Sequence, residues 1–91
     1  MVKVFPAALG GPKYMTHLRM VFPEIKLIPS GGISLETAGD FIRCGACAIS
    51  GARNFLDPSD FETDGPARVA DRIARFIAAV AAARKSAPAL P

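Results

Sequence analysis

The chain has 91 residues, of which 51% are hydrophobic, and a formal net charge of +3. This composition is typical of one small globular domain and excludes an intrinsically disordered chain. The basic residues are scattered without interleaved aromatic side chains, and no apolar run is long enough to cross a membrane, so we expect neither a nucleic-acid nor a membrane partner.

The two cysteines, Cys44 and Cys47, form a single Cys-Gly-Ala-Cys segment. A zinc site needs further ligands, and the one histidine, His17, lies far back in the sequence. We therefore predict buried structural thiols, no metal and no cofactor. The first strand begins directly after Met1 without a hydrophobic leader, which predicts a cytoplasmic protein.

The first stretch of the chain is a short strand with one lysine, Lys3, among the β-formers Val2, Val4 and Phe5. Side chains of a strand alternate between faces, so Lys3 shares a face with Phe5. Two interpretations are open. Lys3 is either an edge-strand charge that prevents pairing between molecules or a buried amine that forms a Schiff base with a carbonyl substrate.

A helix, a second strand and another helix follow in alternation. A helix begins at Pro12 and ends before Pro23, with apolar positions at Met15, Leu18 and Phe22. The second strand, Ile25–Pro29, runs into the small-residue turn Ser30-Gly31-Gly32. Ser34 is the expected cap of the next helix and Gly45 its C-terminal glycine.

The last part of the chain predicts a third strand and a long helix. The strand is Ala46–Ser50, followed by a second small-residue loop that begins at Gly51. Phe55–Phe61 is expected to be irregular. The final helix begins at Asp64, which caps it, and ends near Lys85. Residues 87–91 are expected to be a disordered tail.

The order β-α-β-α-β-α predicts an α/β fold with parallel strands. A complete (β/α)₈ TIM barrel needs about 250 residues, so this chain can supply the last three sectors, with residues 1–86 as a partial TIM-barrel domain. The turns at Ser30–Gly32 and at Gly51 follow the carboxyl ends of consecutive strands. Loops there often hold a phosphate, because glycines let backbone N–H groups approach its oxygens.

Several segments together resemble the C-terminal part of the 2-keto-3-deoxy-6-phosphogluconate (KDPG) and 4-hydroxy-2-oxoglutarate aldolase family, over about residues 2–56. The most specific are Lys-Val-Phe-Pro-Ala from Lys3 and Pro-Ser-Gly-Gly-Ile from Pro29. The resemblance implies a class I aldolase on a (β/α)₈ barrel, usually trimeric. It implies Lys3 as the Schiff-base lysine and Ser30, Gly31, Gly32 and Gly51 as the phosphate-binding residues.

The implied reaction cleaves KDPG, a phosphorylated keto acid, to pyruvate and glyceraldehyde 3-phosphate. A lysine amine at its ordinary pKa of about 10.4 is mostly protonated at neutral pH, so the family mechanism requires an apolar surrounding for the amine. We accordingly expect Lys3 to be buried beside Phe5.

The sequence departs from the family pattern at three places. The family more often has a threonine at the position of Ser30, before the two glycines. The family commonly has a serine after the second phosphate-loop glycine, where this chain has Ala52, followed by Arg53 and Asn54. The family's general base is a glutamate on an early strand, and Glu24, Glu36 and Glu62 match no such motif. The alternatives to an aldolase are therefore a non-catalytic phosphosugar-binding remnant and an assembly module with unpaired sheet edges.

Overall fold

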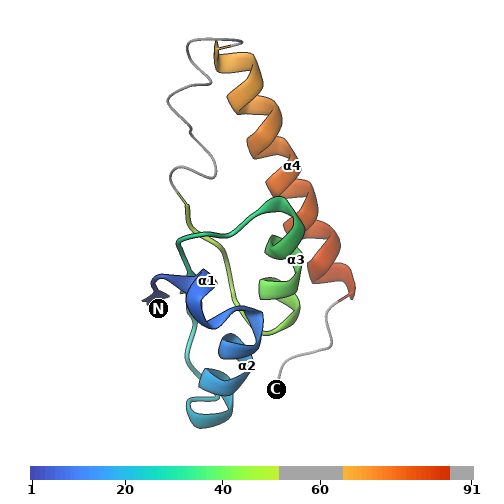
Figure 1. The fold of residues 1–91 in the computed structure, drawn as a ribbon. Coiled ribbons are helices and arrows are strands. Elements are labelled where there is room, and N and C mark those ends of the chain that lie inside the picture. The colour runs from blue at the N-terminus through green and yellow to red at the C-terminus, as the bar shows by residue number, and fades with distance from the viewer. Residues whose placement is uncertain (52–64, 87–91) are drawn as a thin grey trace.

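The computed structural model describes residues 1–51 and 65–86. These residues form two strands and four helices, a mixed α/β arrangement in which the long last helix runs beside α3 (Figure 1). In chain order the elements are β1 (Val2–Val4), α1 (Ala7–Gly10), α2 (Pro12–Val21), β2 (Leu27–Pro29), α3 (Leu35–Arg43) and α4 (Gly65–Ser86).

The two strands pair in parallel, as the alternation of strands and helices predicted. Val2 lies opposite Leu27, Lys3 opposite Ile28 and Val4 opposite Pro29. Parallel neighbours need a crossover connection, which α1 and α2 provide here. The parallel α/β class is therefore confirmed for the described residues.

The third predicted strand, Ala46–Ser50, is not a regular strand. It contacts β2 through two backbone hydrogen bonds, from Cys47 N to Leu27 O and from Ser50 N to Pro29 O, each 2.9 Å long. A regular parallel ladder advances by two residues on both strands, whereas this segment advances by three while β2 advances by two. The extra residue disrupts the ladder, as in a β-bulge, and leaves only an isolated bridge between Ser30 and Ser50.

The hydrophobic core lies between the sheet and the helices. Its largest fully buried side chains include Phe41 of α3, Met15 of α2 and Leu27 of β2. Val4 packs against this core, and register places it on the same sheet face as Leu27. The other sheet face carries Lys3 and Ile28, so the helices cover one face of the two strands.

Local sequence signals explain where the helices begin. Pro12 occupies the first position of α2, as predicted. Ser34 caps α3 and forms a capping box with Thr37, in which each side chain bonds the other residue's backbone N–H. Gly45 follows the end of α3 with φ of +112°, a backbone conformation that favours glycine.

The short helix α1 was not predicted, because it depends on contacts distant in sequence. Ala7 N donates to Ser30 O at 2.7 Å and Ala8 N to Gly31 O at 3.1 Å, which fixes its first turn against the loop after β2. The predicted cap Asp64, the irregular stretch Phe55–Phe61 and the tail 87–91 lie outside the described residues. Among the described helices none is long and apolar enough to cross a membrane.

Candidate active site

The carboxyl ends of the two strands meet in one network of backbone hydrogen bonds. Ser30 N donates to Val4 O at 2.9 Å, and Ser30 O accepts from Ala7 N. The bridge between Ser30 and Ser50 brings the start of the second small-residue loop to the same place. Ser30–Gly32 and Gly51, which the sequence predicted as two phosphate loops, therefore begin at neighbouring positions.

The turn after β2 requires glycine at two successive positions. Gly31 has φ of +92°, and a Cβ atom there would lie 2.7 Å from Cε2 of the Phe5 ring. Gly32 has φ of +75°, and its Cβ would lie 2.5 Å from the Cβ of Ala8. Both the backbone conformation and the close approach of the chain after β1 exclude a side chain here. The Gly-Gly pair therefore holds this turn tightly against the residues that follow β1.

One backbone amide group of this turn is available to a ligand. Among residues 1–51 and 65–86, the N–H group of Gly32 donates no hydrogen bond within the chain, whereas the parallel bridge between Ser30 and Ser50 directs the Gly31 N–H toward Ser50 O. Unpaired N–H groups of a glycine turn are donors of the kind that bind phosphate oxygens.

The N-terminus of α3 follows this turn and already carries one acidic side chain. Glu36 is exposed in the first turn of α3, and hydrogen bonds from its own backbone N–H and from Ser34 lower the pKa of its carboxyl group below the ordinary value. A carboxylate is favoured at a helix N-terminus for the same electrostatic reason as a phosphate. The end of α3 therefore stabilises negative charge.

The prediction that Lys3 is buried beside Phe5 is wrong for this chain. Both side chains are exposed, Phe5 with 73% of its surface accessible. The cause is topological: Lys3 points to the sheet face that the helices leave uncovered, and β1 pairs with β2 on one side only. Lys3 does lie on a strand, β1, which pairs with the strand that ends at the glycine turn, but its environment is not the expected one.

The two cysteines and the residues that follow Gly51 are the remaining positions that the sequence singled out. Cys44 and Cys47 are free and half-buried, so the predicted burial of the thiols is only partial. In the described parts of the chain, no three His, Cys, Asp or Glu side chains gather as metal ligands do. Ala52, Arg53 and Asn54 lie outside the described residues.

The sequence analysis missed Ser50 as a member of this site. Ser50 is the residue that bridges to Ser30, and its backbone N–H bonds Pro29 O. The one available signal was its place at the end of an apolar segment, directly before Gly51. The extra residue in that segment, which decides that Ser50 faces Ser30, has no signature in the sequence.

A lysine-bearing strand, a parallel neighbour and the glycine turn after it place the described residues in the α/β class. A family model described as KDPG and KHG aldolase matches residues 1–72. The chain belongs to this KDPG and KHG aldolase family.

Solved structures agree with this assignment. A structure described as native KDPGal is 29% identical with a TM-score of 0.70, over 91% of this chain and 39% of that chain. A cube-shaped, highly porous cage, designed by fusing symmetric oligomeric domains, is 25% identical with a TM-score of 0.79, over 92% of this chain and 30% of the other. The chain thus spans only 30% to 39% of the length of these two chains. No curated protein matches it.

Proposed function

We propose that this chain is the Schiff-base-forming part of a class I aldolase that cleaves KDPG to pyruvate and glyceraldehyde 3-phosphate. One observation carries the proposal: Lys3 lies on β1, directly before the point where the glycine turn Ser30–Gly32 crosses the end of that strand. An amine and a set of phosphate donors at the same end of a parallel sheet are the two functions that such an enzyme needs.

In the proposed reaction the neutral amine of Lys3 attacks C2 of the keto acid, and the carbonyl oxygen leaves as water. The resulting iminium accepts the electron pair of the C3–C4 bond as a base removes the C4 hydroxyl proton. Glyceraldehyde 3-phosphate leaves, and an enamine of pyruvate remains on the lysine. Protonation at C3 and hydrolysis of the imine release pyruvate and restore the amine.

Ser30, Gly31, Gly32 and Gly51 are the proposed phosphate-binding residues. The unbonded N–H group of Gly32 supports this role, as does the preference of the nearby α3 N-terminus for negative charge. The base for the C4 hydroxyl is expected on an early strand of the complete enzyme, as the resemblance to the family implies. The remaining (β/α)₈ sectors, a trimeric assembly and a cytoplasmic location belong to the same proposal.

Borohydride trapping with pyruvate tests the Schiff base. Reduction of the imine adds a pyruvate-derived group irreversibly to the lysine that formed it, and peptide mapping locates the group. We expect the adduct on Lys3 in clear excess over Lys26, another exposed lysine near the sheet. The Lys3→Ala variant should lose it and the matched Lys26→Ala variant should keep it. An adduct spread equally over the exposed lysines would contradict the proposal.

A non-catalytic phosphosugar-binding domain is the second candidate, and the exposure of Lys3 favours it. The glycine turn and the α3 N-terminus can bind a phosphate whether or not Lys3 reacts. Calorimetry with glyceraldehyde 3-phosphate separates the two. Binding that Lys3→Ala leaves unchanged, together with no trapped adduct, would favour this candidate, and no binding would eliminate it.

A further inference from the structure

The outer edge of β1 presents unpaired backbone groups. Val2 N donates to Lys26 O at 2.8 Å and Val4 O accepts from Ser30 N, so Val2 and Val4 face β2. In a parallel ladder alternate residues point their N–H and C=O groups to opposite sides. The N–H and C=O of Lys3 therefore point away from β2, and no described residue bonds them. This edge can accept one more strand.

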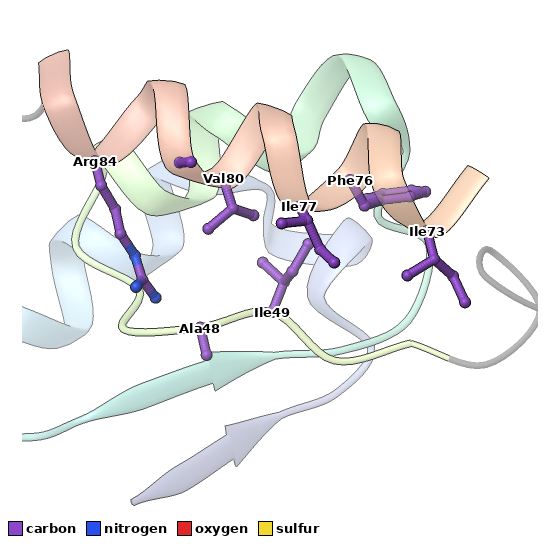
Figure 2. Close-up of a pocket in the computed structure, with 8 residues that line it drawn as sticks. Ala48, Ile49, Ile73, Phe76, Ile77, Val80 and Arg84 are labelled. Carbon is purple, nitrogen blue, oxygen red and sulfur yellow. The ribbon is translucent and has the colours of Figure 1, made fainter. Parts of the chain in front are cut away.

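The opposite side of the sheet ends in an apolar groove. It has a volume of about 530 Å³ and lies between α4 and the segment Ala48–Ile49, on the helix side of the sheet and away from the face of Lys3 (Figure 2). Figure 2 shows Ile49 pointing up toward α4, with Ile77 and Val80 pointing down toward the same space. Arg84 closes one end and donates from Nη2 to Cys47 O at 2.6 Å. Ile77 is 64% exposed, so a large aliphatic side chain lies open at this groove.

We propose that the β1 edge and the α4 groove are two seams that bind one partner: a polypeptide with the amino-terminal β/α part of a KDPG/KHG aldolase fold. The inference rests on the proposed function and names the partner of that same site. It follows from the unpaired edge of β1 and from the open groove beside α4. It follows also from the coverage, because this chain matches only 39% of the KDPGal chain. A strand of the partner pairs with β1 beside Lys3, and apolar side chains of the partner fill the groove.

A second copy of this chain fits these surfaces less well. Two β1 edges paired about a two-fold axis would be antiparallel and would place the two Lys3 side chains close together on the same sheet face, where like charges repel. The same pairing would leave the α4 groove of each copy unfilled. The two surfaces therefore favour a different polypeptide, and self-association is an outcome that the experiment must distinguish.

The experiment co-expresses this chain, carrying an affinity tag, with the part of the KDPGal aldolase chain that it does not match. We expect the two to copurify and to form a one-to-one complex by light scattering. Amide exchange followed by NMR should show at least tenfold slowing for Lys3 in the complex. The Val2 amide, already bonded to Lys26 O, should change much less. A homodimer, no copurification or an unprotected Lys3 amide would overturn the proposal.

A matched pair of variants tests the groove separately. Ile77→Glu places a charge in the groove and should weaken association at least tenfold, whereas Ala78→Glu adds the same charge to the neighbouring exposed position outside the groove. Because both positions are exposed, circular dichroism should show the same helix content for both variants. Equal association of the two variants would contradict the groove as a seam.

The Lys3→Ala variant distinguishes this inference from the proposed function. It keeps the backbone groups of β1 and should associate with the partner as the parent does. If it associates and the parent complex traps no pyruvate, the docking surface stands and the aldolase proposal fails. If the parent traps pyruvate on Lys3 but does not copurify with the partner, the docking surface fails and the chemistry stands.

Discussion

The two faces of the β1–β2 sheet differ in what covers them. One face presents Val4 and Leu27 to the core built around Phe41, which is 1% exposed. The other face carries Lys3 and Ile28, with Phe5 73% exposed at its margin. The covered face supplies the hydrophobic stabilisation of the fold, and the open face carries the residue proposed for chemistry.

This difference teaches that the fold and the site have different requirements. The helices of this chain are sufficient to bury one face and to set the register of the strands, and thereby the positions of the glycine turns. They do not create the apolar surrounding that a Schiff-base lysine needs. A partner strand beside β1, as proposed above, would add cover to the open face and make the surrounding of Lys3 more apolar.

The largest effect is expected from removing the Phe41 ring, which lies in the core beneath the covered face, and comparing it with removal of the Phe5 ring at the open face. Phe41→Ala deletes a fully buried ring, and we expect a loss of about 3–5 kcal/mol in the free energy of unfolding. Phe5→Ala makes the same chemical change on the open face and should alter it by no more than about 0.5 kcal/mol. Urea denaturation followed by circular dichroism measures both. Similar losses would show that the open face is buried in solution.

The next largest effect is expected at the glycine turn, where two glycine-to-alanine variants can be compared for stability. Gly32→Ala combines a positive φ with a Cβ atom 2.5 Å from that of Ala8, whereas Gly11→Ala has a similar φ of +72° and no atom within 4 Å. Because steric contact is the added cost, we expect Gly32→Ala to be less stable than Gly11→Ala by about 1–3 kcal/mol. Denaturation midpoints of the two variants give the difference directly. Equal midpoints would mean that the turn does not pack on α1.

The smallest expected effect concerns Glu36 at the start of α3. Its pKa is lower in the folded chain than the ordinary 4.5, because its own backbone N–H and Ser34 bond the carboxylate. This group therefore stabilises the fold above pH 4.5, and its contribution is lost as pH falls through the lower folded-state value. Glu36→Gln should flatten the stability profile in that acid range.

The control for this titration is Ser34→Ala, which removes the cap as well as one bond to the carboxylate. Ser34→Ala should lower the free energy of unfolding by about 1 kcal/mol at neutral pH, because the helix loses its cap. The effect of Glu36→Gln is instead expected in the dependence of stability on pH in the acid range. Denaturation in urea between pH 7 and pH 3 checks both. An acid-range profile of Glu36→Gln that matches the parent would contradict the role assigned to this carboxylate.

The features that the sequence predicted correctly are those with local causes. The start of α2 at Pro12, the Ser34 cap and the parallel order of strands follow from residue types and spacing. The irregular course of Ala46–Ser50 and the existence of α1 depend on backbone hydrogen bonds to distant residues, which leave no pattern in the sequence. The exposure of Lys3 follows from the uncovered face of the two described strands, which the residue types around Lys3 do not encode.

The extra residue between Cys47 and Ser50 decides which chemical group borders the glycine turn. With strict two-residue steps, Ile49 would donate to Pro29 O and would occupy the place beside Ser30 that Ser50 takes. The single inserted residue shifts the phase of the segment, so that the aliphatic side chain of Ile49 points under α4 and a serine reaches the turn. The extra residue therefore places an aliphatic side chain in the apolar space under α4 and a hydroxyl-bearing residue beside the turn where a phosphate is proposed to bind.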